Sequence, residues 1–218
     1  MDKEQVIQAV KKAREGKKRN FIQTFDLQVA LKHIDLKKPE NKINTQIKLP
    51  HGRGKKVKLA FVVDPENMKK AKEFSDIVLT KEDLADLAKN KLETKKLARK
   101  VDYFVVQANL MQQLARTIGP VLGPRGKMPK PSQIMPPKAD NMAQIAEFLN
   151  SAVNLAIKNQ PVLNAPVGTE KQSDEEIAEN VLAILSYLQH NLPNPKHQIH
   201  SVHIKTTMGK PVRIGGGE

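Results

Sequence analysis

Hydrophobic and polar residues alternate with a period of two near both ends of the chain. In residues 21–31 one apolar face is formed by Phe25, Leu27, Val29 and Leu31. Residues 43–49 and 153–157 alternate in the same way. Because successive side chains of a strand point to opposite faces, each segment predicts a strand with one buried face. We expect segments 21–31 and 43–49 to pair as antiparallel neighbours, since each leaves a polar face for solvent.

The middle of the chain has a different pattern. Residues 57–63 are almost continuously apolar, which is typical of a strand covered on both faces. Further short apolar segments lie at 77–79 and 101–107. They alternate with helical stretches, which we place at 64–74, 81–89, 91–99, 109–117 and 141–150. This rhythm predicts a parallel sheet with helices on both sides.

Two helices are predicted in the outer parts of the chain. Residues 3–15 place Val6, Val10 and Ala13 on one stripe, as an amphipathic helix does. Ser173 followed by Glu176 forms a capping box, and an apolar stripe continues from it to about residue 190. Both segments therefore have one face to bury against a sheet.

These patterns predict a two-lobed protein of the α/β and α+β class. A Rossmann-like parallel α/β domain, residues 59–150, is inserted into a discontinuous α+β domain with an antiparallel-rich sheet, residues 1–58 and 151–218. The change from alternating strands to buried strands and back carries this prediction. We expect linkers near residues 55–57 and 150–153. A single mixed sheet running through the chain is the alternative.

Charge narrows the choice of partner. The formal net charge is +14 and the pI is near 9.8, which favours nucleic acid or an anionic membrane surface. The longest apolar run, 59–63, is far below the roughly 20 residues that a membrane span needs, so we expect no membrane. The N-terminus lacks the layout of a signal peptide, and the absence of cysteine fits a cytosolic protein.

Residues 119–131 form a segment rich in proline and glycine. Its four prolines exclude both helix and central strand on this interpretation, so we predict an ordered surface loop or a linker. Its charged side chains are Arg125, Lys127 and Lys130. These cations are candidates for contact with an anionic partner, and a purely structural loop remains the alternative.

No catalytic constellation is present. A phosphate-binding loop ending at Gly126-Lys127 would need glycine at Val121 and Ser or Thr at Met128. His197, His200 and His203 stand three residues apart, but on a strand the middle one faces away from the others. We therefore expect no enzyme, no metal and no cofactor. A nucleotide-using enzyme in the α/β lobe and a DNA-binding architectural protein are the alternative functions.

The last predicted strand, residues 199–207, offers the first candidate site. It buries Val202 and Ile204, and its other face consists of Ser201, His203, Lys205 and Thr207. Hydroxyl groups on a flat sheet can read the wide RNA minor groove, where 2′-hydroxyls are displayed. Thr24 and Asp26 extend this surface if their strand lies beside it. A solvated strand face is the alternative.

A basic stripe adds candidate phosphate contacts. It consists of Lys17, Lys18 and Arg19, preceded by Lys11, Lys12 and Arg14 on the first helix. Such a run is often only a solvated face. Beside a sheet that carries Ser and Thr, it would neutralise RNA phosphates.

Four separated motifs resemble one protein family. They are residues 118–130, Leu49-Pro50-His51-Gly52, Ala165-Pro166-Val167-Gly168 and the C-terminal segment 201–209. In order and spacing they resemble large-subunit ribosomal protein one, and most closely its archaeal members. The resemblance implies RNA contacts at Phe21, Thr24, Ser201, Thr207, Met208 and Gly209. Asp26 stands where archaeal relatives usually carry Glu, and Lys210 separates Gly209 from the proline that normally follows it.

The resemblance also implies a function. Members of this family bind large-subunit rRNA and form the mobile stalk near the tRNA exit site, where the movable lobe assists release of deacylated tRNA. They also repress translation by binding their own mRNA. We therefore expect a cytoplasmic, ribosome-bound protein that is a monomer when free.

Overall fold

The computed structural model describes residues 2–16, 19–36, 43–137, 141–157, 160–192 and 195–215. The chain divides into two compact units: unit 1 comprises residues 1–55 and 150–218, and unit 2 comprises residues 56–149. Unit 1 is built around an antiparallel sheet and unit 2 around a parallel sheet. The predicted combination of α/β and α+β architecture is therefore confirmed.

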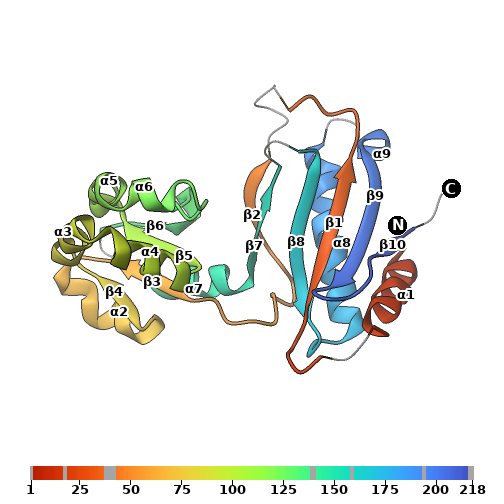
Figure 1. Cartoon of the computed structure of the whole chain (residues 1–218), viewed down its shortest axis with the longest axis horizontal. Helices are drawn as coiled ribbons and strands as arrows, with labels where there is room; N and C mark the ends of the chain where they lie inside the picture. Colours follow the sequence, from red (N-terminus) through yellow and green to blue (C-terminus); the bar gives the residue numbers. More distant parts are fainter. Residues whose placement is uncertain are drawn as a thin grey trace. The chain divides into compact units, whose positions relative to one another are not determined.

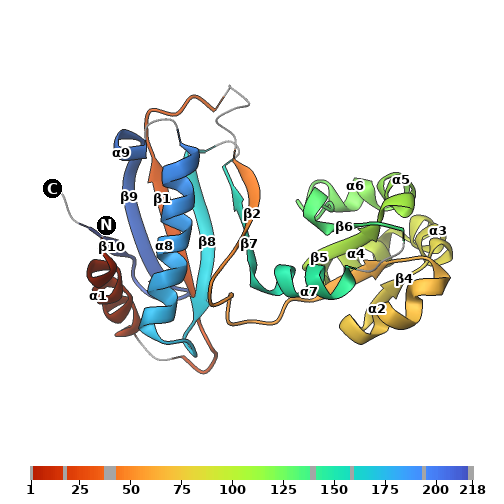
Figure 2. The ribbon, with the colours of Figure 1, turned by 180° about the vertical axis from the view of Figure 1, so that it is seen from behind.

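The main sheet of unit 1 has four strands in the order β10-β9-β1-β8. They are β1 (Thr24–Leu31), β8 (Val162–Thr169), β9 (Ile199–Thr206) and β10 (Val212–Ile214), and all neighbours are antiparallel. The apolar face predicted for β1 is buried, and it packs in one core with helices α1 (Lys3–Arg14) and α8 (Asp174–Asn191). Helix α8 crosses this face of the sheet in Figure 2. The short helix α9 (Pro195–Gln198) leads directly into β9.

The predicted pairing of segments 21–31 and 43–49 is wrong. Strand β2 (Asn44–Lys48) pairs instead with β7 (Ala152–Ala156) in a separate antiparallel ribbon. A strand has two edges for hydrogen bonding, and β8 and β9 occupy both edges of β1. Strand β2 therefore finds its partner elsewhere, although its own alternation was identified correctly.

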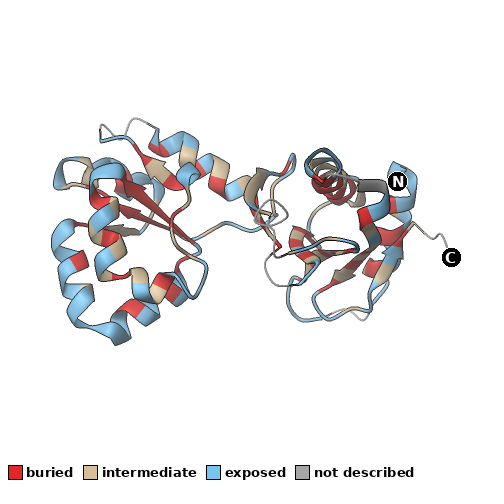
Figure 3. Ribbon diagram, turned by 90° about the horizontal axis from the view of Figure 1, so that it is seen from above, coloured by how far each residue is buried: buried red, intermediate tan, exposed pale blue. Residues whose placement is uncertain are grey.

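Unit 2 contains a parallel sheet in the order β4-β3-β5-β6. Its strands are β3 (Leu59–Val62), β4 (Ile77–Leu79), β5 (Tyr103–Gln107) and β6 (Ile134–Met135). One side packs against helices α3 (Lys81–Lys89), α4 (Lys91–Lys100) and α5 (Ala108–Thr117), and the other against α2 (Met68–Phe74) and α7 (Met142–Ser151). Strands β3 and β5 are consequently buried at every position, as Figure 3 shows in red.

The proline-rich segment is more regular than predicted. Helix α6 (Gly119–Leu122) begins inside it, and a 3₁₀ helix spans Pro131–Gln133. In both cases proline lies in the first turn, where its missing N–H has no helical partner to lose. The four prolines therefore shorten helices here without excluding them.

The segment that leaves β2 is anchored to α8. The buried side chain of Asn180 donates from Nδ2 to the carbonyl oxygens of Gly52 at 2.9 Å and Val167 at 2.8 Å, and it accepts from the His51 N–H at 3.1 Å. Residues 55–57 then continue without helix or strand. Where the chain returns from unit 2 to unit 1, α7 ends at Ser151 and β7 begins at Ala152, so no irregular residue lies between them.

Candidate nucleic-acid interface

Among the described residues of unit 1, no helix covers one face of the main sheet, as Figure 1 shows for β8, β1 and β9. Strands β1 and β9 are direct neighbours, so Thr24 and Asp26 on β1 lie beside the polar side chains of β9. Their register pairs Asp26 with Lys205, Gln28 with His203 and Ala30 with Ser201. Ser201, His203 and Lys205 are half-buried, while Val202 and Ile204 between them are fully buried. The predicted polar face therefore exists as one continuous surface.

Two further residues extend this face. Arg213 on β10 pairs with His203, and Asn164 on β8 pairs with Gln28. Both side chains are exposed. Arg213 was missed because strand β10 has only three residues, too few for an alternating pattern to be recognised. A row of polar side chains thus crosses all four strands.

Thr207 has a structural task at the end of the sheet. Its hydroxyl donates to the Thr24 carbonyl at 3.2 Å and accepts from the Thr24 N–H at 3.1 Å. The Thr207 N–H also donates to the same carbonyl at 3.0 Å. The hydroxyl is therefore already bound within the chain, unlike that of Ser201, which makes no hydrogen bond in the described part of the molecule.

A tight turn follows β9 and presents Met208. The Gly209 N–H donates to the Thr206 carbonyl at 3.0 Å, which closes the turn. A Cβ atom at position 209 would collide with the Thr206 hydroxyl oxygen, so any larger residue would require the Thr206 side chain to move. The Met208 side chain is 61% exposed as a result.

Gln23 connects this turn with two other segments. Its side-chain Nε2 donates to Glu170 Oε1 at 2.9 Å, and its Oε1 accepts from the Met208 N–H at 3.1 Å. Its backbone N–H donates to Glu170 Oε2 at 3.0 Å. Gln23 is only 3% exposed. It fixes the ends of β1, β8 and β9 together.

Exposed apolar side chains surround this connection. Phe21 and Ile22, which directly precede Gln23 in the chain, are each 52% exposed. Met208 is exposed as well, and its N–H is bound to the Gln23 side chain.

The sequence contains a signal for Gln23 that was missed. It shares the parity of Phe25 and Leu27, so a polar residue stands at a position that the alternation assigns to the core.

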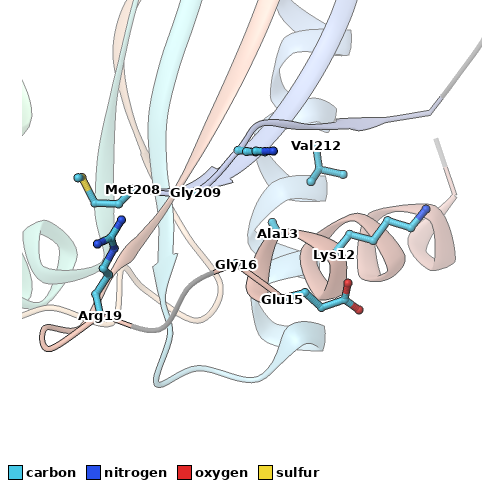
Figure 4. Close-up of a pocket in the computed structure, with 9 residues that line it drawn as sticks. Lys12, Ala13, Glu15, Gly16, Arg19, Met208, Gly209 and Val212 are labelled. Carbon is cyan, nitrogen blue, oxygen red and sulfur yellow. The ribbon is translucent and has the colours of Figure 1, made fainter.

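A groove of about 370 Å³ borders the turn. It is lined by Lys12, Ala13, Glu15, Gly16, Arg19, Met208, Gly209, Lys210 and Val212. Figure 4 shows Arg19 and Met208 at one end and Lys12 with Glu15 at the other. The cations Lys12 and Arg19 thus line the same groove as the exposed apolar side chain of Met208.

The predicted basic stripe is only partly available for this role. Arg14 turns inward: it donates to the carbonyls of Glu170 and Gln172 at 2.8 and 2.9 Å, pairs with Asp174 and covers the Phe25 ring at 5.3 Å. Its guanidinium therefore holds the β8–α8 turn against α1. Lys17 and Lys18 lie outside the described residues.

Asp26 is the acidic residue of the sheet face. Burial raises the pKa of its carboxyl, and the neighbouring Lys205 ammonium partly opposes that shift. A carboxylate in this place accepts hydrogen bonds and donates none, which suits a ribose hydroxyl better than a phosphate.

The cations of the proline-rich segment lie in unit 2 and have partners there. Arg125 Nη1 donates to the Lys95 carbonyl at 3.2 Å. Lys127 Nζ donates to the carbonyls of Ala98 at 2.9 Å and Val101 at 2.5 Å. The backbone N–H of Lys130 donates to Gln133 Oε1 at 3.1 Å. These contacts support a structural role for the segment.

At the C-terminal edge of the parallel sheet, where α/β proteins usually hold ligands, polar side chains bind other groups of the chain. Gln107 is completely buried and binds the Asp64 N–H at 2.5 Å and the Pro137 carbonyl at 2.8 Å. Asn109 donates to Asp64 Oδ2 at 2.6 Å. In the part of the chain that the structure describes, no three His, Asp or Glu side chains gather as metal ligands, and no helix is both long and apolar enough to span a bilayer.

Taken together, these features define a basic two-unit protein with a polar sheet face on unit 1. The chain belongs to the Ribosomal protein L1p/L10e family, whose model matches residues 10–210. It is 43% identical over 216 residues to large ribosomal subunit protein uL1 of Pyrococcus horikoshii, with 99% of this chain and 97% of the relative covered. The predicted resemblance is confirmed.

Two further relatives agree with this assignment. Large ribosomal subunit protein uL1 of Thermococcus kodakarensis is 42% identical over 214 residues, with 98% of each chain covered. The protein of the same name from Methanothermobacter thermautotrophicus is 43% identical over 213 residues, with 97% of this chain and 99% of the relative covered. These names describe a ribosomal protein and not an enzyme.

Proposed function

We propose that this chain is a structural protein of the large ribosomal subunit that binds large-subunit rRNA through the open sheet face of unit 1. The observation that carries the proposal is the juxtaposition of β1 and β9, which places Ser201, His203, Lys205 and Asp26 on one surface. Membership of the family supports rRNA as the ligand. We place the protein in the cytoplasm, bound to the ribosome.

Recognition would combine two kinds of contact. Ribose hydroxyls and base edges of an RNA minor groove meet the flat polar face, which has donors and acceptors without protruding helices. An unpaired base stacks on Phe21 beside Met208, since both side chains are exposed at the end of the same sheet. Arg19, Lys12 and Lys210 supply charge for neighbouring phosphates.

The finer functions follow from the same proposal. Bound to rRNA, the protein forms the mobile stalk near the tRNA exit site, and unit 2 assists release of deacylated tRNA. The free protein, a monomer, binds a similar structure in its own mRNA and represses translation. rRNA and mRNA then compete for one surface, so simultaneous binding of both RNAs in a titration would contradict the repressor role.

Titration against a folded rRNA stalk fragment and a DNA duplex of matched length tests the main proposal. The expected result is tighter binding to RNA at each of several salt concentrations. Phe21→Ala should weaken RNA binding by about fivefold or more, since stacking of one base contributes about 1–3 kcal/mol. Phe74→Ala is the matched control, because Phe74 is also exposed but lies on α2 of unit 2.

The DNA duplex separates this proposal from an architectural DNA-binding role. Equal affinity for RNA and DNA, with no effect of Phe21→Ala, would show that the net charge of +14 alone attracts nucleic acid. The sheet face would then have no part in recognition.

A further inference from the structure

The positive charge of unit 2 is concentrated on one small part of its surface. Residues 56–149 contain 17 Lys and Arg against 11 Asp and Glu. Eight of these basic residues, but only one of the acidic ones, lie on α4 or in segment 123–130. The remainder of unit 2 carries slightly more acidic than basic residues. We call the exposed cations of this region the α4 patch: Lys91, Lys95, Lys96, Arg99, Lys100 and Arg125.

Helix α4 presents these cations in an ordered array. Its buried residues Thr94 and Ala98 face the core, so the opposite side is open to solvent. Lys91, Lys95 and Arg99 follow one another four residues apart, and a rise of 1.5 Å per residue spaces them about 6 Å along the helix. The stripe is thus about 12 Å long, enough for about three consecutive phosphates of one strand.

An exposed leucine stands inside this array. Leu92 is 71% exposed, the largest value among the exposed apolar side chains of the described residues. Lys95, Lys96 and Arg99 follow it at the three, four and seven positions that share its face of the helix. An apolar side chain surrounded by cations suits a ligand with alternating sugar and phosphate groups.

The proline-rich segment holds α4 in place. Arg125 binds the Lys95 carbonyl, and the Lys127 ammonium binds the carbonyls of Ala98 and Val101 at the C-terminal end of the helix. At the N-terminal end the Thr94 hydroxyl donates to the Leu87 carbonyl of α3 at 2.6 Å. The cations are therefore carried by a helix that is attached to its neighbours along its length.

These cations are not neutralised within the chain. Across the described residues, no carboxylate forms an ion pair with any of the five α4 cations. Like charges four residues apart on a helix oppose its stability. An external polyanion would remove that repulsion.

We propose that the α4 patch binds the phosphate backbone of an RNA helix and is a second RNA surface, separate from the sheet face of unit 1. The charges of unit 2 carry this inference, and only the choice of RNA over other polyanions rests on the proposed function. Contact is to the backbone, because the major groove of an RNA helix is too deep and narrow for these side chains to read its base edges. Binding is therefore independent of sequence and steeply dependent on salt.

The test uses the full chain after saturation with an unlabelled stalk fragment of rRNA, which occupies the sheet face. A labelled RNA hairpin of unrelated sequence is then titrated into the complex at several salt concentrations. Lys95→Glu/Arg99→Glu removes the centre of the patch. Lys69→Glu/Lys72→Glu makes the same change of charge on the exposed face of α2 and is the matched control.

The expected result is hairpin binding that the α4 variant weakens by at least tenfold and the α2 variant by less than twofold. The salt slope of log K should become shallower by about one to two units in the α4 variant, since each lost phosphate contact changes it by about 0.7 to 0.9. Thermal unfolding of both variants should match that of the original chain.

Three outcomes would overturn the inference. If the original complex does not bind the hairpin, the α4 patch is only a solvated face. If both variants weaken binding equally, net charge and not the patch attracts RNA. If polyglutamate binds as tightly as the hairpin, the surface fits an acidic protein. Failure of the proposed function would show separately, as failure of the stalk fragment to bind, and the hairpin titration would then be made on the free chain.

Discussion

The sheet face of unit 1 and the α4 patch of unit 2 differ in how they would contact RNA. The sheet face combines two cations with hydroxyls, an imidazole, two amides and a carboxylate, whose positions are fixed by strand register and by the buried Gln23. The α4 patch contains Lys and Arg, and among the described residues its five α4 cations form no ion pair with a carboxylate. Hydrogen-bonding groups in fixed places favour selectivity, whereas a row of cations favours affinity that depends on salt.

The largest expected effect comes from a substitution at Gln23, which should weaken RNA binding by the sheet face but not by the α4 patch. Gln23→Glu places two carboxylates where an amide and a carboxylate now share a 2.9 Å hydrogen bond. A buried charge without a partner costs more than a lost hydrogen bond, so stalk RNA affinity should fall by about ten- to a hundredfold. Hairpin binding by the α4 patch should stay within twofold.

A second substitution makes this prediction reversible. Glu170→Gln in the Gln23→Glu background exchanges the two groups: the new amide donates to the new carboxylate, and both backbone N–H groups keep an acceptor. RNA affinity should recover. A double variant that unfolds at the original temperature yet binds RNA as weakly as the single variant would contradict the positioning role of Gln23.

The next effect concerns the support of the α4 patch. Lys127→Met removes the ammonium that binds two carbonyls at the end of α4, and unit 2 should lose about 1–3 kcal/mol of unfolding free energy. The chain has no Trp and two Tyr, so a Tyr187→Phe background leaves Tyr103 as a fluorescent reporter of unit 2. Lys70→Met, at an exposed site on α2, should leave the denaturant midpoint unchanged.

A smaller effect depends on pH and on the anchor between β2 and α8. Glu179 accepts hydrogen bonds from Lys3 at 2.9 Å and from His51 at 2.5 Å. These bonds, and chiefly the one from His51, lower the pKa of Glu179 from 4.5 to about 2. An acid whose pKa is depressed by folding stabilises the protein above its unfolded pKa and loses that contribution as pH falls.

The measurement is the unfolding temperature of the original chain minus that of Glu179→Gln. This difference should fall toward zero as the pH is lowered from 4.5 to about 2. A difference that does not change with pH would show that the Glu179 carboxylate adds nothing through its charge.

The smallest expected effect comes from Asp26. Asp26→Glu extends the carboxylate by one methylene from a half-buried position, so it should reach a ribose hydroxyl better and strengthen binding to stalk RNA by about two- to threefold. Hairpin binding to the α4 patch should not change. Weaker binding to stalk RNA would show that the shorter side chain fits this surface.

The alternation along β1 and β9 predicted both faces of the unit 1 sheet, because burial of every second side chain leaves a direct mark in the sequence. Continuous apolar runs likewise predicted the covered strands β3 and β5. The sequence contains no comparable signal for which strands pair with each other. The pairing of β2 with β7 depends on which edges of β1 are free, and that is settled only when β8 and β9 are in place.

The site shows the same limit. Side chains on the open face could be predicted from their parity, but the supporting contacts could not, because they join residues more than 140 positions apart. Gln23 meets Glu170 and Met208 in this way, and Arg14 meets Glu170. Arg14 and Lys127 resemble phosphate contacts in the sequence, yet their charged groups bind carbonyl oxygens of the chain itself.

Ser201→Ala tests the central claim about the sheet face most directly. The Ser201 hydroxyl makes no hydrogen bond in the described structure, so its removal changes little besides the surface that RNA would contact. The account predicts a loss of about fivefold or more in affinity for the stalk fragment, with no change for a DNA duplex or in unfolding temperature. Ser186→Ala, exposed on α8, should change none of these. Unchanged affinity of Ser201→Ala for the stalk fragment, with RNA and DNA bound equally well, would contradict the account.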